Sequence, residues 1–273
     1  MAESKESFVQ VRDARVFVRR GGAGAPLLFL HGSGGLSGWP PFLDKLSDRY
    51  DVIAPDLPSF GRSPRPDWLD DMADMAYFIA DFLAAQNLTA LHVVGYSIGG
   101  WLAQEVAIRS TTRLASLTLI SSAGIRIRGK PAADLFMMDR GQQVRALFAD
   151  PKLAEQMLAV TLTQEQQDEI IANNVAAARL CWQPRFFNPK LRTWLHRIDI
   201  PTQILWGDSD QLIPPEYGPE YQRLIPGSKL TVFAKTGHAV HVDRMGGTPG
   251  SKVFVHAELQ SVFRRGAVPQ YVP

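Results

Sequence analysis

The sequence predicts an α/β protein with an open, mostly parallel, doubly wound sheet and an inserted helical cap. Two observations support this fold class: short, nearly continuous apolar runs recur along the chain, and segments with helical periodicity lie between them. Parallel strands that are buried on both faces have such continuous apolar sequences. Alternation of strand and helix indicates right-handed crossovers, which place helices on both faces of one sheet.

The apolar runs place the strands in order along the chain. In FVQV (8–11) and RVFV (15–18) apolar residues alternate, so we expect a short antiparallel hairpin at the start of the sheet. Six buried strands are then predicted: PLLFL (26–30), VIAP (52–55), LHVVG (91–95), LTLI (117–120), QILW (203–206) and LTVF (230–233). Helical spacing predicts helices at Phe42–Leu46, Met72–Leu83 and Ile98–Ile108, and a last one at about Lys252–Phe263 after a flexible loop at 245–251.

The alternation of strand and helix stops after Ile120 and resumes at Thr202. The interval contains PAADLFMMDRGQQVRALF, PKLAEQML and QEQQDEIIANNVAAARL, which predict three or four helices and no strand. We therefore expect a core domain formed by residues 1–122 and 200–273, and a helical cap formed by residues 123–199. Open α/β sheets bind ligands at the carboxyl edge of their strands, so the cap is expected at that edge.

The composition limits the classes of function. With 45% hydrophobic residues in 273, the chain has enough apolar side chains for a packed core. Its 29 basic and 27 acidic side chains nearly balance. The one basic cluster, Arg126–Lys130, lacks interleaved aromatic residues, so we expect a solvated loop there and no nucleic-acid partner.

The single cysteine, Cys181, cannot form an internal disulfide and fits a reducing compartment. No motif indicates a metal or another cofactor. The sequence contains no signal-peptide h-region and no apolar window of membrane-spanning length, so we expect a cytoplasmic location and no membrane attachment. The oligomeric state stays open.

The stretch GYSIGG (95–100) places Ser97 between two glycines, after an apolar strand and before a helix. A sharp strand-to-helix turn strains its central residue and needs small neighbours where strand and helix nearly touch. Gly95 and Gly99 meet that need. Ser97 would then project at the amino end of a helix, where developing negative charge is stabilised. We predict that Ser97 is a nucleophile; the alternative is an ordinary turn.

A serine hydroxyl needs a base that removes its proton and a carboxylate that orients the base. His238 follows the last predicted strand after a tight glycine turn, which places it on the same edge as Ser97, so we expect it to be the base. His241 is the second candidate. GDSDQLIPP follows QILW and offers two acids, of which Asp210 is expected to orient His238, because Asp208 lies at the turn itself.

The developing oxyanion needs hydrogen-bond donors. One is expected to be the backbone N–H of Ile98, directly after the serine. The other is expected from the loop LFLHGSGG (28–35), with Ser33 as the first choice and Gly34 as the second. The alternative for this loop is a merely flexible glycine-rich turn.

The chain order Ser, Asp, His on parallel strands resembles the α/β-hydrolase superfamily, from about Val9 to Phe263. The resemblance rests on HGSGG (31–35), DLPSFGRS (56–63), GYSIGG, the spacing of Gly207, Asp210 and Pro214, and TGH (236–238). It implies a hydrolase core with a cap and no cofactor. In DLPSFGRS, Asp56 is expected to cap the turn.

The resemblance also separates related groups within the superfamily. Serine at position 97 differs from the aspartate nucleophile of haloalkane dehalogenases and epoxide hydrolases, and the elbow does not match the GGSWG of proline iminopeptidases. Carbon–carbon hydrolases of ring-fission products are more similar, with loops like HGxGPG and elbows like GNSMGG. This chain departs from them at Gly35, Tyr96, Ile98 and Ala239.

Aromatic residues and methionines of the cap predict an apolar substrate pocket, although most side chains at helical spacing pack in a core. The predicted substrate-binding residues are Trp39, Tyr96, Met137, Phe148, Trp182 and Phe186. An inward Arg126 or Arg128 would favour a substrate that carries a carboxylate.

We therefore expect a cofactor-independent serine hydrolase of small apolar carboxylic esters. Three alternatives stay open: a carbon–carbon hydrolase of ring-fission-type diketo acids, a non-catalytic protein that binds a small molecule, and acyl transfer to an alcohol other than water.

Overall fold

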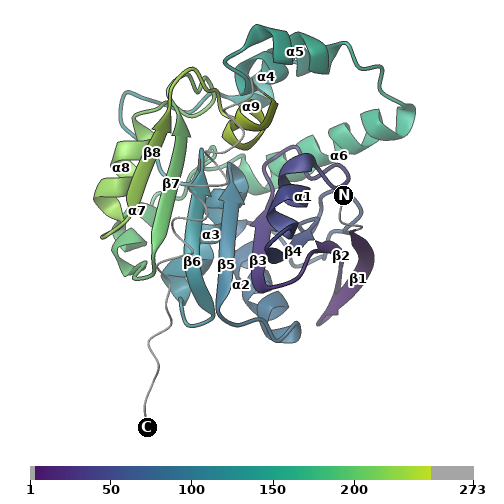
Figure 1. The fold of residues 1–273 in the computed structure, drawn as a ribbon, viewed down its shortest axis with the longest axis vertical. Coiled ribbons are helices and arrows are strands. Elements are labelled where there is room, and N and C mark those ends of the chain that lie inside the picture. The colour runs from purple at the N-terminus through teal and green to yellow at the C-terminus, as the bar shows by residue number, and fades with distance from the viewer. Residues whose placement is uncertain (1–3, 247–273) are drawn as a thin grey trace.

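A computed structural model describes residues 4–246 (Figure 1). Its strands are β1 (Lys5–Val11), β2 (Ala14–Gly21), β3 (Ala25–Leu30), β4 (Tyr50–Pro55), β5 (Leu91–Tyr96), β6 (Leu114–Ile120), β7 (Thr202–Gly207) and β8 (Lys229–Phe233). They form one sheet in the order β1-β2-β4-β3-β5-β6-β7-β8. The hairpin β1–β2 pairs antiparallel and joins β4 in the same sense, whereas β3 to β8 pair parallel. The predicted open, mostly parallel α/β sheet is therefore confirmed.

Both faces of this sheet are covered by helices. Helices α2 (Met72–Ala85), α3 (Ile98–Arg109) and α8 (Tyr217–Leu224) pack on one face, and α1 (Pro41–Ser47) and α9 (Val240–Gly246) pack on the other. In β3, Leu28 and Leu30 face the first group, while Leu27 and Phe29 face the second. Because successive side chains of a strand point to opposite faces, a strand covered on both faces has a continuous apolar sequence.

Between β6 and β7 the described chain forms helices and no strand. These are η1 (Leu135–Met137), α4 (Arg140–Leu147), α5 (Pro151–Leu158), α6 (Gln164–Cys181), α7 (Leu191–Trp194) and η2 (Leu195–Arg197). Reciprocal side-chain and backbone hydrogen bonds at Asp139 and Thr163 fix where α4 and α6 begin. We call residues 123–199 the cap; its boundaries stay a prediction. Figure 1 shows α4, α5 and α6 beyond the carboxyl ends of the parallel strands.

Two elements differ from the expectations. Helix α8 was not expected, because YGPEYQRL has few aliphatic residues; it is anchored by the buried rings of Tyr217 and Tyr221. Helix α9 covers the first two residues of the loop expected at 245–251. The rest of that loop and the helix expected at Lys252–Phe263 lie outside the described residues. Within residues 4–246, no helix has the length and apolar character needed to cross a membrane.

Candidate active site

Ser97 lies at the turn from β5 into α3, in a strained backbone conformation. Its φ of 55° and ψ of −118° lie where residues other than glycine rarely occur. Serine at a helix start commonly accepts a backbone N–H with its side chain, but Ser97 makes no such bond. Its hydroxyl therefore stays available for chemistry, in a side chain that is buried at the edge of the sheet.

The glycines beside Ser97 allow three backbone segments to come close together. A Cβ on Gly99 would lie 2.1 Å from the carbonyl oxygen of Leu30, at the end of the neighbouring strand β3. A Cβ on Gly95 would lie 2.7 Å from the Cα of Gly100. Side chains at these positions would clash with backbone, which accounts for the small residues around the serine.

His238 is held by a buried carboxylate. Its Nδ1 lies 2.9 Å from Oδ2 of Asp210, whose side chain has no exposed surface. The other oxygen of Asp210 accepts the backbone N–H groups of Leu212 and Ile213, each at 2.9 Å. These contacts fix the direction of the carboxylate, and the carboxylate in turn holds the imidazole of His238 at Nδ1.

The second candidates for base and acid lie elsewhere. Asp208 is exposed, and its Oδ1 accepts from Ser209 Oγ at 2.8 Å and from the N–H of Thr236 at 3.4 Å. The ring of His241 packs at 4.4 Å from Tyr96 and 4.7 Å from Phe42. Burial, and secondarily the nearby His238, lower the pKa of His241 to about 3, so its ring is neutral. The structure thus brings Asp210, and not Asp208, to His238.

Two cavities among the described residues lie at or near Ser97. The first is lined by Ser97 and His238 together with apolar side chains, and its volume of about 10 Å³ leaves room for roughly one water molecule. The second has a volume of about 340 Å³ and lies between the cap and Ser33. Leu135 and Phe186 line both cavities, so these two cap side chains separate the larger space from the serine.

Of the expected oxyanion donors, Ile98 directly follows Ser97, and Ser33 directly follows Gly32, which lies against Ser97. Ile98 is the first residue of α3, so its N–H has no acceptor within the helix. The loop after β3 lies against the elbow, because a Cβ on Gly32 would be 3.3 Å from Cβ of Ser97. Ser33, the next residue, borders the larger cavity, whereas a Cβ on Gly34 would meet open space. Among residues 4–246, the N–H groups of Ser33 and Ile98 donate no hydrogen bond.

Comparison with known proteins identifies the family to which this chain belongs. The sequence profile described as alpha/beta hydrolase fold matches residues 25–244. The chain belongs to the alpha/beta hydrolase fold family. This agrees with the sheet, with the strained serine after β5, and with the superfamily that the sequence motifs resemble.

Relatives within the alpha/beta hydrolase family differ in their named activities. The chain is 30% identical to a dihydrolipoyllysine-residue acetyltransferase component of an acetoin cleaving system from Cupriavidus necator, covering 89% of this chain and 67% of that protein. It is 30% identical to a 2-hydroxy-6-oxo-2,4-heptadienoate hydrolase from Pseudomonas putida, covering 82% and 86%. A crystal structure of a membrane phospholipase A from a bacterial source matches with a TM-score of 0.76 and 26% identity, covering 95% of this chain and 87% of that one.

The predicted substrate-binding residues lie in different places on this hydrolase fold. Phe186 lines both cavities and Trp182 lines the larger one. Phe148 is buried in a small apolar cluster with Ala239, and the centre of the Tyr96 ring lies 5.2 Å from that of His238.

Two of the predicted substrate-binding residues, Trp39 and Met137, lie away from the two cavities. Trp39 packs over Gly21, where an added Cβ would lie 2.9 Å from the indole, because the loop after β3 folds back onto the sheet. Met137 is 78% exposed and lines neither cavity, because η1 turns its side chain outward. Arg126 and Arg128 are also exposed, and the guanidinium of Arg126 lies 5.5 Å from the ring centre of Phe187.

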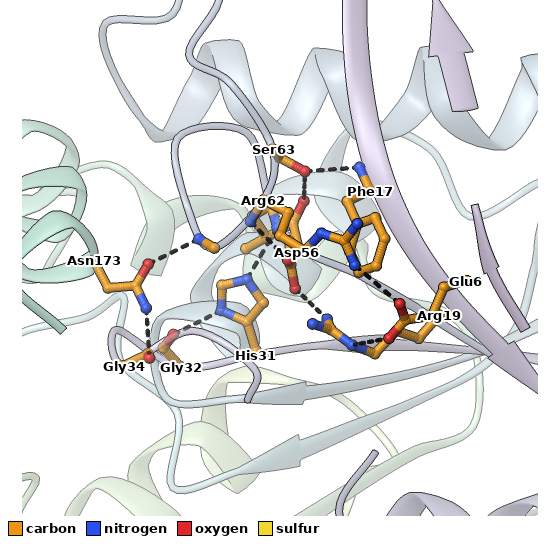
Figure 2. A network of polar contacts seen from close by, with 12 residues as sticks. Glu6, Phe17, Arg19, His31, Gly32, Gly34, Asp56, Arg62, Ser63 and Asn173 are labelled. Carbon is orange, nitrogen blue, oxygen red and sulfur yellow. Dashed lines mark hydrogen bonds and ion pairs between the residues drawn. The ribbon is translucent and has the colours of Figure 1, made fainter. Parts of the chain in front are cut away.

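The predicted site residues leave out most of the wall of the larger cavity and two polar residues behind the loop 31–35. The cap side chains that line the larger cavity include Leu135, Phe136, Met138, Ile171 and Val175. The polar residues are His31 and Asn173, which belong to the network drawn in Figure 2. His31 stood in the HGSGG motif, but Asn173 had no local signal beyond being one polar residue in a polar helix.

Figure 2 also shows how the loop DLPSFGRS is held. Asp56 is buried and accepts hydrogen bonds from Arg19 and from the backbone N–H of Arg62. Ser63 Oγ donates to the carbonyl of Asp56 at 2.6 Å and accepts the N–H of Phe17 at 2.9 Å. These contacts stabilise a turn and place no side chain at Ser97, in keeping with the structural part expected of Asp56.

Proposed function

We propose that this protein is a serine hydrolase that cleaves small, uncharged carboxylic esters through an acyl-enzyme on Ser97. One observation carries the proposal: an uncapped serine in a strained elbow shares a cavity with His238, and His238 is held at Nδ1 by the buried Asp210. A nucleophile, a base and an orienting acid in this order form the machinery of acyl transfer to serine.

In the proposed reaction, His238 removes the hydroxyl proton of Ser97 as Oγ attacks the ester carbonyl. The negative charge that forms on the carbonyl oxygen is stabilised by the N–H groups of Ile98 and Ser33, which have no other acceptor among the described residues. His238 then gives its proton to the leaving alcohol. A water molecule, deprotonated by the same histidine, attacks the acyl-enzyme and releases the carboxylic acid, while Asp210 stabilises the charged imidazole in both steps.

The cavity walls support an uncharged substrate. Within residues 4–246, His238 is the one ionisable side chain that lines either cavity near Ser97; the polar side chains of the larger one are Ser33, Gln143 and Asn174. A substrate carboxylate buried in this space would lose its hydration without gaining a cation, which is costly. Arg126 and Arg128, the two cations considered for this place, are exposed. Leu135 and Phe186 would select an apolar acyl or alcohol group.

Two relatives keep other reactions in view. The hydrolase from Pseudomonas putida is named for a dienoate, and carbon–carbon cleavage of a diketo acid would use the same three residues. The relative from Cupriavidus necator is named as an acetyltransferase component, and an acyl-enzyme on Ser97 would equally transfer its acyl group to an alcohol or thiol. The uncharged cavity walls favour the ester over the diketo acid.

The proposed function is tested by labelling and by turnover. A fluorophosphonate probe should modify Ser97, as identified by mass spectrometry of the labelled peptide, and p-nitrophenyl esters of increasing chain length should be hydrolysed. Ser97→Ala should remove the labelling and lower kcat by about 10⁶-fold. Ser110→Ala, at the exposed end of the same helix, is the matched control and should behave like the wild type.

Three outcomes separate the alternatives. Faster turnover of a vinylogous diketo acid than of any ester would favour the carbon–carbon hydrolase. Ester turnover that yields a new ester when an alcohol is added would indicate acyl transfer. A folded protein that neither labels nor turns over would contradict the enzyme proposal and leave the protein that only binds a small molecule.

A further inference from the structure

Asn173 is a buried polar residue in the middle of the cap helix α6. It is 2% exposed, whereas Ala172 and Asn174 on either side of it are exposed. A buried carboxamide is costly unless its donors and its acceptor find partners. The hydrogen-bond partners of Asn173 therefore show which parts of the molecule its side chain holds together.

The partners of Asn173 are two loops of the core. Its Nδ2 donates to the carbonyl oxygen of Gly34 at 2.9 Å, and its Oδ1 accepts the N–H of Gly61 at 2.9 Å. Gly34 belongs to HGSGG and Gly61 to DLPSFGRS. Figure 2 shows the amide nitrogen of Asn173 pointing toward Gly34. The fit is close, because a Cβ on Gly35 would lie 2.5 Å from Nδ2 of Asn173.

The peptide between Gly34 and Gly35 closes a turn onto the Gly32 carbonyl oxygen, and this turn sets the direction of the Ser33 N–H. The peptide between Gly34 and Gly35 is held by Asn173 at its oxygen, and its N–H donates to the carbonyl oxygen of Gly32 at 3.1 Å. His31 contacts the same Gly32 oxygen through Nδ1 at 2.8 Å. Because the Leu57 N–H donates to Nε2 of His31 at 3.0 Å, Nδ1 carries the proton and is the donor.

A peptide unit is planar and trans, so its N–H points away from its own carbonyl oxygen. Fixing the Gly32 oxygen with two donors therefore fixes the direction of the Ser33 N–H, which belongs to the same peptide. His31 makes this contact from within the core. Asn173 acts from the cap, through the Gly34–Gly35 peptide that closes the turn.

We propose that Asn173 is a positioning residue for oxyanion stabilisation, through which cap helix α6 sets the geometry of the Ser33 N–H. The proposal rests on the proposed function, because it takes Ser33 to be an oxyanion donor. In this proposal the docked cap orients the Ser33 N–H as well as forming the wall of the cavity. Loss of the Asn173 carboxamide should leave substrate binding largely intact and slow the step in which the oxyanion forms.

The test uses two substitutions of Asn173 and matched changes at an exposed amide on the same helix. Asn173→Asp keeps an acceptor for Gly61 and replaces the donor to Gly34, and Asn173→Ala removes both without adding a charge. Gln167→Glu and Gln167→Ala are the controls, because the Gln167 side chain is exposed and donates to the backbone oxygen of Leu162 within the cap. For each variant we would measure the rate of fluorophosphonate labelling, kcat per titrated serine, KM and the melting temperature.

Removing an oxyanion donor outright lowers kcat by about 10²–10³-fold, and displacing one should cost less. We expect both Asn173 variants to show kcat and labelling rates lowered by about 10-fold to 100-fold, with KM changed by less than about 3-fold. Both Gln167 variants should match the wild type. A trifluoromethyl ketone, which forms a tetrahedral adduct on the serine, should bind the Asn173 variants more weakly in proportion to their loss in kcat/KM.

The outcomes are distinguishable. Asn173 variants that fold and label as fast as the wild type would overturn the positioning role and leave the proposed function standing. Loss of folding in both variants would also overturn it, since Asn173 would then serve stability. A rise in KM with unchanged kcat would assign Asn173 to substrate binding instead. A wild type that does not label at Ser97 would refute the proposed function itself.

Discussion

The carboxylate of Asp210 has a partner for each of its oxygens, and this decides its part in the site. One oxygen faces Nδ1 of His238 and the other accepts two backbone N–H groups, so the side chain cannot rotate without losing buried hydrogen bonds. Asp208, two residues earlier, makes polar contacts with the turn around it. Of these two acids in the same loop, only Asp210 contacts His238.

Replacing each acid by its amide tests whether Asp210 or Asp208 is the one that matters for turnover. In Asp210→Asn, the new NH₂ group competes with the proton on Nδ1 and favours the wrong tautomer of His238, so kcat should fall by about 10³–10⁴-fold. Asp208→Asn at the exposed position should change kcat by less than about 3-fold. Steady-state ester hydrolysis per titrated serine measures both. If Asp208→Asn were the more damaging change, the assignment of Asp210 would be wrong.

At the scale of elements, the elbow is a contact among β5, α3 and the end of β3. The strain at Ser97 is retained because the surrounding backbone is fixed: the Ser97 N–H donates to Ile120, and its carbonyl accepts from Gly100, Trp101 and Ala123. The first turn of α3 can approach β3 only because position 99 has no side chain.

A methyl group at position 99 should therefore damage the elbow. In Gly99→Ala the new Cβ would lie 2.1 Å from the Leu30 oxygen and 2.5 Å from the His31 oxygen, and backbone cannot yield as a flexible side chain does. We expect the free energy of unfolding to fall by about 3 kcal/mol or more, as measured by urea titration. Gly141→Ala in α4, where the nearest atom is the tip of Arg145, should cause no loss. Equal stability of the two variants would contradict the close approach.

At the scale of the whole molecule, stability should depend on pH through buried histidines. The pKa values of His31 and His241 are lowered mainly by burial, which disfavours the charged ring, and that of His241 falls to about 3. In the unfolded chain both rings take up a proton near a pH of about 6.5. Below that pH the unfolded state binds more protons than the folded state, so acidification favours unfolding.

The free energy of unfolding should thus decrease as the pH is lowered from about 7 to about 5, by up to about 1.4 kcal/mol per pH unit for each such histidine. His241→Phe removes one of these groups and keeps an aromatic ring beside Phe42 and Tyr96, so it should reduce the slope. His196→Phe, at an exposed position, is the matched control for the added ring. Urea titrations at several pH values measure the slope, and an unchanged slope in His241→Phe would contradict the burial argument.

Local patterns in the sequence were enough to predict the sheet, the sharp turn at Ser97 and the helices of the cap. Period and composition encode burial: LHVVG is apolar throughout most of its length because both faces of β5 are covered, and glycines stand where backbones meet. The placement of His238 and of an acid after β7 also followed from strand ends, because the carboxyl ends of parallel strands lie at one edge. The choice of Asp210 over Asp208 rested on the place of Asp208 at the turn itself. The catalytic roles of these residues stay predictions.

Only the tertiary structure decided which distant residues meet. Trp39 was expected at the pocket but packs on Gly21. Leu135, which precedes α4 in the sequence, and Phe186, which follows α6, both line the cavity at Ser97. Asn173 contacts Gly34 across 139 residues of sequence. A single side chain carries no local signal of such a contact, because the contact depends on how helix α6 docks on the core, and docking is set by the sum of many packing contacts along both surfaces.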